Sequence, residues 1–327
     1  MTPTTYDRAS ASSRKARQDA EPCVQASSQA RPARSTTTIR CALPKGRMQE
    51  GVLRLFAEAG VDIQSGARSY RPNVPLAGFE TKLLKPQNIV EMLSAGTRDV
   101  GFAGADWVAE LDADLVELCD TGLDPVRIVA AAPRELVPDG LSLTECAAQI
   151  ERPLLIASEY ERLTRRWIAD LGIEARFVLS YGATEVFPPE DADVIVDNTA
   201  TGSTLEANGL VVVEELMRSS TRLYASREAY ADPARRAALD DLVLLFESVL
   251  EARRRVMVEV NVGPDALEAV VATLPCMREP TIATLHGRAG YAVKAAVPRR
   301  RLPELVPLIK AAGGTDVVVS RVAQIVA

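Results

Sequence analysis

The sequence of 327 residues contains a single histidine, His286, and few aromatic residues, only 5%. One histidine nearly excludes a mechanism with a histidine base or a histidine-rich metal site, unless that residue itself serves. Its five cysteines are scattered, without the spacing of a metal site: Cys23, Cys41, Cys119, Cys146 and Cys276. We interpret them as reduced thiols in a cytosol-like compartment.

The sequence also lacks an excess of basic over acidic residues and lacks long apolar runs. The formal net charge of −6 does not suggest non-specific nucleic-acid binding, so a bound polyanion must meet local basic residues. No apolar run approaches the length needed to span a bilayer. The content of 47% hydrophobic and 25% charged residues is typical of a soluble globular protein with two or three domains. We therefore expect a cytoplasmic protein that binds neither nucleic acid nor membrane.

The first 38 residues are rich in Ser, Ala, Thr and Arg and show no hydrophobic periodicity. Such a segment buries too little surface to offset its ordering entropy, so residues 1–38 are predicted to be a disordered tail. The segment lacks the continuous apolar stretch that a secretory signal peptide contains. Its scarcity of acids is compatible with an organelle transit peptide, which keeps a plastid location open as the alternative to the cytoplasm.

From Ile39 onward, strand-like and helix-like segments alternate, which predicts an α/β fold with parallel sheets covered by helices. Two successive α/β sets predict two lobes with a ligand cleft between them. The predicted strands include Ile39–Leu43, Val100–Ala103, Val126–Ala131 (closed by Pro133), Leu154–Ala157, Phe177–Ser180 and Asp193–Val196, followed by strands within Val211–Ala225 and a helix over Pro233–Ala252. After the hinge Arg253-Arg254-Arg255, the order βαββαβ predicts a small ferredoxin-like domain.

The stretch around Asp197 carries the strongest functional signal. An apolar strand ends in Asp197, and a loop of small hydroxyl residues follows, centred on Gly202 and leading into a helix. Backbone N–H groups converge at such a helix start and favour a phosphate, and glycine allows close approach. Asp197 could hold ribose hydroxyls or a magnesium-bound water. An ordinary capped helix start remains the alternative.

Other candidates lie at further strand-to-helix turns. Lys45-Gly46-Arg47 offers two cations for a phosphate chain, and the alternative is a solvated loop. Lys85 precedes a helix, and Arg127, alone in an apolar strand, must face a partner or water. Gly104 and Asp106 shape a third turn. Glu185 is expected to face the cleft, whereas His286 is interpreted as structural or regulatory.

Together these motifs resemble the long form of ATP phosphoribosyltransferase, the first enzyme of histidine biosynthesis. The resemblance runs from about Ile39 to the C-terminus. The matching blocks are Ala42-Leu43-Pro44-Lys45-Gly46-Arg47, Leu84-Lys85-Pro86-Gln87-Asn88-Ile89, Asp99-Val100-Gly101-Phe102-Ala103-Gly104-Ala105-Asp106 and the stretch from Glu185 to Thr201-Gly202-Ser203-Thr204-Leu205. Each block is weakly specific, but their combined order is a strong signal.

The resemblance implies transfer of a 5-phosphoribosyl group from phosphoribosyl pyrophosphate to N1 of ATP, with Mg²⁺ as cofactor. It implies a catalytic region like periplasmic binding proteins, with lobe I at 39–133 and about 216–252 and lobe II at 134–215. An ACT-like regulatory domain at 253–327 would bind histidine as feedback inhibitor, and dimers would assemble into hexamers.

The expected site follows from these matches. Asp197, Glu185 and Arg47 are the expected catalytic residues. Asp197 is the expected metal contact, with the metal held largely through the substrate phosphates. The phosphoribosyl pyrophosphate site is expected at Asp197, Asn198, Thr199, Ala200, Thr201, Gly202, Ser203 and Thr204. The ATP site is expected at Lys45, Gly46, Arg47, Lys85, Gly104, Asp106 and Arg127.

Two departures from the family pattern affect the expected site. Asn198 follows the loop aspartate where the family often has an aliphatic residue. Leu123-Asp124-Pro125-Val126 stands before Arg127 where the family often has a glycine–cysteine pair. The alternatives are a paralogue with another acceptor base, which the residues around Arg127 keep open, and a non-catalytic small-molecule-binding protein on the same scaffold.

Overall fold

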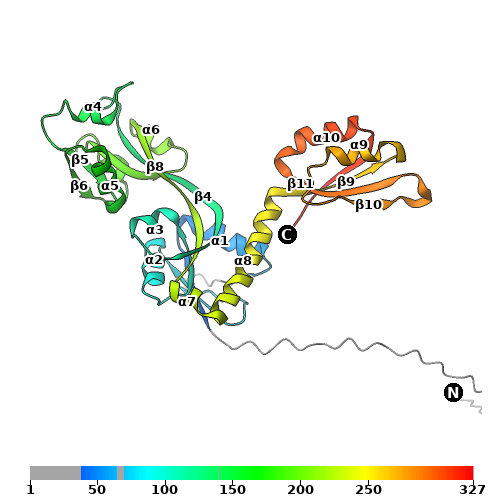
Figure 1. Ribbon diagram of the computed structural model, residues 1–327. Coiled ribbons are helices and arrows are strands. Elements are labelled where there is room, and N and C mark those ends of the chain that lie inside the picture. Colours follow the sequence, from blue (N-terminus) through cyan, green and yellow to red (C-terminus); the bar gives the residue numbers. More distant parts are fainter. Residues whose placement is uncertain (1–37, 65–69, 139, 327) are drawn as a thin grey trace, which may run out of the picture. The chain divides into compact units, whose positions relative to one another are not determined.

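The computed structural model describes residues 38–64, 70–138 and 140–326 (Figure 1). The predicted disordered tail therefore lies outside the described residues, except for its last residue. The predicted α/β fold with a C-terminal ferredoxin-like domain is confirmed. No helix in these three stretches is long and apolar enough to cross a membrane.

One eight-stranded sheet is formed by the strands between residues 39 and 225. Its strands lie in the order β2 (Phe79–Leu84), β1 (Ile39–Pro44), β3 (Val100–Gly104), β8 (Leu210–Ala225), β4 (Val116–Pro133), β7 (Val194–Thr199), β5 (Leu154–Ser158) and β6 (Ala175–Leu179). The outer strands form two parallel groups of three, whereas β8 and β4 run antiparallel to each other and to their neighbours. The prediction of parallel sheets is therefore wrong for this central pair.

Strand β4 is also longer than the sequence pattern indicates, whereas β8 is one strand over nearly the tract Val211–Ala225 in which the sequence predicts several. Strand β4 has 18 residues, of which the sequence predicts only the apolar end, Val126–Ala131. Its first half contains Asp120, Gly122 and Asp124 and is paired with β8 through several register shifts. Strand prediction depends on an alternating apolar pattern, which these polar residues and register shifts interrupt. The first half of β4 was therefore not predicted.

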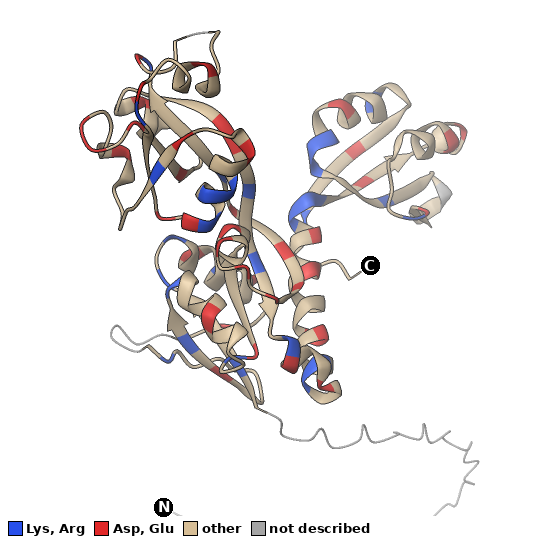
Figure 2. Cartoon of the chain, turned by 60° about the vertical axis from the view of Figure 1, so that its left-hand side comes forward, with Lys and Arg blue, Asp and Glu red and all other residues tan. Residues whose placement is uncertain are grey.

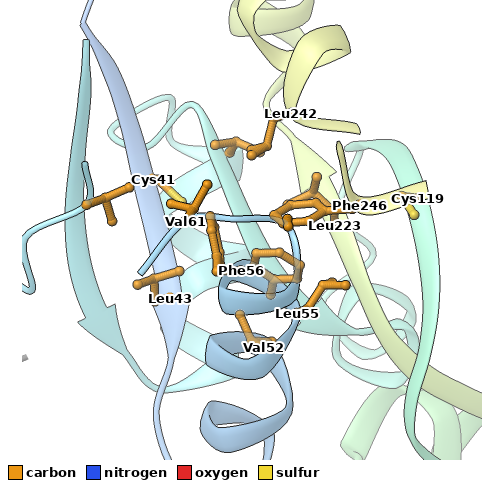
Figure 3. Close-up of a cluster of buried hydrophobic side chains, with 14 of the residues drawn as sticks. Cys41, Leu43, Val52, Leu55, Phe56, Val61, Cys119, Leu223, Leu242 and Phe246 are labelled. Atoms are coloured by element: carbon orange, nitrogen blue, oxygen red, sulfur yellow. The ribbon is translucent and has the colours of Figure 1, made fainter. Parts of the chain in front are cut away.

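Helices α1 (Arg47–Glu58) and α8 (Pro233–Arg254) pack on the first group of strands and form the first hydrophobic core. Figure 3 shows this cluster, in which the rings of Phe56 and Phe246 meet edge to face with centroids 4.8 Å apart. Phe102 from β3 completes the trio, 5.9 Å from Phe56. Because β1, β3, α1 and α8 all contribute, this core joins the start of the region to residues about 200 positions later.

A second core lies against the other group of strands. It contains Ile128, Val194 and Trp167, the last from α5 (Glu161–Leu171), and α4 (Leu143–Ala147) contributes as well. Cys119 and Leu223 belong to the first core, whereas Ile128 belongs to the second and Met217 packs against it. The division between the cores thus crosses the middle of β4 and β8, whereas the sequence places the lobe boundaries near residues 133 and 216.

Further short helices in this part of the chain are α2 (Pro86–Ser94), α3 (Ala105–Glu110) and α6 (Ser203–Ala207). Helix α7 (Arg227–Ala231) precedes α8. The C-terminal domain has an antiparallel sheet in the order β10 (Thr281–Thr284), β11 (Tyr291–Pro298), β9 (Arg255–Val262) and β12 (Gly314–Arg321). Helices α9 (Leu267–Thr273) and α10 (Leu302–Ala311) supply apolar residues to a third core.

The aromatic trio generates a test of the first core. Phe246→Ala should lower the free energy of unfolding by about 3–5 kcal/mol, because it removes a fully buried ring and leaves a cavity. Leu244→Ala is the matched control on the same helix, since Leu244 is 49% exposed. Chemical denaturation of both variants measures the difference. Equal destabilisation by the two substitutions would contradict this packing.

Candidate functional site

A cavity of about 300 Å³ lies where strands of both groups end. On the side of the first group it is lined by the segment after β1 and the start of α3, and the central strands β4 and β8 contribute residues from their middle parts. From the second group it receives the residues after β5 and the end of β7. Its lining consists of Lys45, Arg47, Met48, Pro86, Gln87, Gly104, Asp106, Trp107, Asp124, Val126, Glu159, Tyr160, Asn198, Ser219, Ser220 and Thr221.

Asp106 is the centre of a hydrogen-bond network in this cavity. Its carboxylate is buried and accepts from Ser219 Oγ at 2.6 Å and from Tyr160 Oη at 2.8 Å. Ser219 Oγ in turn accepts from the Asp106 backbone N–H at 3.1 Å. Tyr160 Oη accepts from Asn198 Nδ2 at 3.3 Å. The network therefore links the start of α3 and the middle of β8 to the ends of β5 and β7.

Local sequence allows Asp106 to take this position. A Cβ on Gly104 would lie 2.1 Å from Asp106 Oδ1, so only glycine leaves space for the carboxylate. The ring of Trp107 packs on the ring of Tyr160 with centroids 4.8 Å apart. Burial, followed by the charge of Asp106, raises the pKa of the Tyr160 hydroxyl far above its usual range, so this hydroxyl remains a hydrogen-bond donor.

The hydroxyl-rich loop begins where β7 leaves the cavity. Gly202 has φ 87°, a left-handed conformation, and its N–H donates to Thr199 Oγ1 at 2.9 Å. Thr201 Oγ1 and Ser203 Oγ lie 3.0 Å apart, and both side chains are exposed. The following helix, α6, has only five residues, so its dipole is weak and the polar donors at this place are chiefly the loop's N–H and hydroxyl groups.

Asp197 lies just before this loop, close to the carboxylates of Glu185 and Glu159. Burial, partly opposed by the hydrogen bond from the Asn198 backbone N–H and reinforced by the charges of Glu185 and Glu159, raises the pKa of Asp197 to about 6. That N–H lies 2.7 Å from Asp197 Oδ1. Among residues 38–64, 70–138 and 140–326, no group of three or more His, Cys, Asp or Glu is arranged to hold a metal ion by itself.

The basic candidates separate into two groups. Lys45 and Arg47 line the cavity, and Lys45 Nζ lies 3.8 Å from the centroid of the Tyr70 ring. Lys85 is exposed just before the lining residues Pro86 and Gln87. Arg127 is paired with Thr199 in the β4–β7 register, and its Nη1 lies 3.5 Å from Glu215 Oε2. The structure thus places Arg127 beside the hydroxyl loop and outside the cavity lining.

Of the other residues expected from sequence, Gly104, Asp106 and Asn198 line the cavity. Gly46 adopts φ 82° as the residue before α1. Glu185 lies in a short 3₁₀ helix, close enough to Asp197 to affect its pKa, whereas His286 lies in the C-terminal domain. Ala200, Thr201, Ser203 and Thr204 belong to the exposed loop.

Sequence reasoning missed several lining residues. The main ones are Glu159 and Tyr160 after β5, and Ser219 to Thr221 within β8. A signal existed for the first two, because β5 and β7 are parallel and their carboxyl ends meet at one edge of the sheet. No comparable signal marks Ser219, which reaches the cavity from the middle of an antiparallel strand.

Comparison with known proteins gives consistent similarities. The family described as ATP phosphoribosyltransferase matches residues 85–248, and the one described as the HisG C-terminal domain matches residues 252–324. The ATP phosphoribosyltransferase of Pelotomaculum thermopropionicum is 35% identical over 285 residues, covering 86% of this chain and 96% of that protein. The enzyme of the same name from Desulforudis audaxviator is 36% identical with the same coverage.

A solved structure supports the fold. The ATP phosphoribosyl transferase (HisG:HisZ) complex from Thermotoga maritima contains a chain that matches with a TM-score of 0.56 and 24% sequence identity. The match covers 65% of this chain and 99% of that chain. At this level of identity the likeness concerns the arrangement of the backbone.

The raised pKa of Asp197 generates a test by pH. Between its usual value of 3.8 and about 6, the folded state holds the Asp197 proton more tightly than the unfolded state does. The stability of the wild type should therefore fall relative to Asp197→Asn as pH rises through that window. The variant should match the wild type near pH 4 and be about 1–3 kcal/mol more stable at pH 7.

Urea denaturation at both pH values measures this difference. Asp191→Asn is the control, because it removes a carboxylate from an exposed position in the same segment. A difference between wild type and Asp197→Asn that does not change with pH would contradict the proton-binding explanation.

Proposed function

The chain belongs to the ATP phosphoribosyltransferase family, and on that premise we propose what each part of the cavity does in the family's reaction. The reaction transfers the 5-phosphoribosyl group of phosphoribosyl pyrophosphate to N1 of ATP. The C1′–O bond to pyrophosphate breaks, the C1′–N1 bond forms, and pyrophosphate leaves with the electron pair. The observation that carries the proposal is the continuity of the site: Asn198 lines the cavity, and the hydroxyl loop starts at the next residue.

Phosphoribosyl pyrophosphate occupies the side of the cavity formed by β7. The N–H and hydroxyl groups of residues 199–204 bind its 5-phosphate, and the Asp197 carboxylate accepts from the ribose hydroxyls. Arg127, opposite Thr199, adds a positive charge at the start of the loop. Exposed hydroxyls and a left-handed glycine suit this role, because they can surround an anion without a steric barrier.

ATP occupies the opposite side. Lys45 and Arg47 bind its phosphates, and Lys85 adds charge at the rim next to Pro86. Gly104 and Asp106 form the wall on which the nucleotide packs. Asp106 keeps Tyr160 and Ser219 fixed, so both substrates meet a wall that does not have to reorganise during the reaction.

Positive charge develops at C1′ as pyrophosphate departs. Asp197, Glu185 and Glu159 surround this region with negative charge, as the raised pKa of Asp197 indicates. That field stabilises the developing charge, and no residue has to form a covalent intermediate. The scarcity of histidine agrees with a mechanism based on positioning and electrostatics.

We propose Mg²⁺ as the cofactor, bound mainly through the substrate's pyrophosphate. The described acids do not form a metal cage of their own, and Mg²⁺ commonly binds substrate phosphates with one or two carboxylates and water. Asp197 would hold it, because a nearby cation offsets the excess of negative charge there. When bound, Mg²⁺ neutralises charge on the leaving pyrophosphate.

The hydroxyl loop generates a test of this proposal. Gly202→Val places a β-branched residue at φ 87°, where it is strained, and should lower the rate of phosphoribosyl-ATP formation at least about 100-fold by displacing the loop. Gly172→Val is the matched control, because Gly172 has φ 65°, open space around its Cβ position and a place at the end of α5.

The control should lose similar stability and retain activity within about twofold, since its strain lies away from the cavity. Turnover is measured with saturating ATP, phosphoribosyl pyrophosphate and Mg²⁺, and circular dichroism checks that both variants are folded. Near-normal activity of Gly202→Val would overturn the assignment of this loop.

We also propose feedback inhibition by histidine and assembly of dimers into hexamers, both through the C-terminal domain. Its strands β10 and β12 carry many exposed residues, which leaves surface for a ligand or another subunit. Adding histidine should lower the rate of product formation, whereas imidazole alone should not. Rates with increasing histidine measure the effect, and a rate unchanged by histidine would refute the regulatory part while leaving the catalytic part intact.

A further inference from the structure

Two runs of arginine meet at the start of the C-terminal domain. Strands β9 and β11 are antiparallel, and their register pairs Arg255 with Pro298. The chain that leaves β11 at Pro298 therefore passes beside the end of α8. Figure 2 shows basic stretches where α8 joins β9. The sheet register thus brings together six arginines that are far apart in sequence: Arg253, Arg254, Arg255, Arg299, Arg300 and Arg301.

Carboxylates neutralise only half of this group. Arg253 pairs with Glu58 at 2.8 Å, Arg301 lies 3.7 Å from Glu304, and Arg255 pairs with Glu251. Within the part of the chain that the structure describes, no carboxylate lies within ion-pair distance of Arg254, Arg299 or Arg300. All three side chains are exposed. Three unpaired guanidinium groups at one place contrast with a chain whose net charge is −6.

These arginines line a cavity of about 750 Å³, which lies within the size range of small-molecule sites. Its lining is Glu251, Arg253, Arg254, Arg255, Pro298, Arg299, Arg300 and Pro303. The one acid, Glu251, is already paired with Arg255. The two prolines restrict the backbone on either side of Arg299 and Arg300, which lowers the entropic cost of holding a ligand.

We propose that this cavity binds a pyrophosphate group, either as free pyrophosphate or as part of a nucleoside di- or triphosphate. Guanidinium groups bind phosphate oxygens through two parallel hydrogen bonds, and three of them without a carboxylate at ion-pair distance match several phosphate oxygens. A ligand here contacts the end of α8, whose Phe246 and Val249 lie in the first core, and the first residues of the C-terminal domain. The cavity is separate from the catalytic one in all its lining residues.

Calorimetric titration of the full-length protein with inorganic pyrophosphate tests the proposal. The wild type should show two classes of site. Arg299→Ala with Arg300→Ala should weaken one class at least tenfold without changing turnover, whereas Gly202→Val should weaken the other. Arg54→Ala with Arg227→Ala is the charge-matched control and should retain both classes, because these two exposed arginines lie in surface ion pairs elsewhere. Repeating the titrations with ATP distinguishes a nucleotide ligand from free pyrophosphate.

Three outcomes would overturn the proposal. The first is a single class of sites in the wild type that Gly202→Val abolishes. The second is unchanged binding in the Arg299 and Arg300 double variant. The third is a change of oligomeric state in that variant with unaltered pyrophosphate binding, which would identify the arginines as a contact between copies of the chain. Loss of turnover in Gly202→Val bears on the catalytic loop alone, so failures of the two proposals are distinguishable.

Discussion

The antiparallel pairing of β4 with β8 is the constraint on which the catalytic region depends. Each strand begins in one hydrophobic core and ends in the other, so a backbone hydrogen-bond ladder with several register shifts joins the two lobes. The pairing of Val126 with Ser219 places both residues at the cavity wall. Because the cores are fixed to opposite ends of this ladder, the cavity between them is held by backbone geometry as well as by side chains.

Side-chain hydrogen bonds to Asp106 also connect the two sides of the cavity. A buried carboxylate is costly unless hydrogen bonds satisfy it, and Ser219 and Tyr160 supply donors from different parts of the sheet. Asp197 lies near Glu185 and Glu159, and its pKa is raised. One aspartate therefore stabilises the wall, while the other retains free capacity for a substrate hydroxyl or a cation. Two residues of the same type thus lie in different environments because their partners differ.

The sequence could predict those parts of the fold and site that depend on local patterns. The loop after Asp197 and the turns at Lys45 and Gly104 each follow an apolar strand directly, and this position allowed them to be predicted as site residues. Tyr160 and Ser219 could not be predicted as site residues without knowing which strands are neighbours. The register shifts of β4 interrupt its apolar pattern, so the strand that connects the lobes was predicted only in part. The roles of the individual site residues remain predictions, since they depend on bound substrates.

The identity of the acceptor is the most direct test of the account, because Asp124 and Val126, which depart from the family pattern, line the cavity. The measurement is the rate of phosphoribosyl transfer by the purified protein with phosphoribosyl pyrophosphate, Mg²⁺ and a pyrophosphatase, supplied with either ATP or GTP. The account predicts phosphoribosyl-ATP with ATP and no transfer to GTP. Equal transfer to both nucleotides, or no product from folded protein, would contradict it.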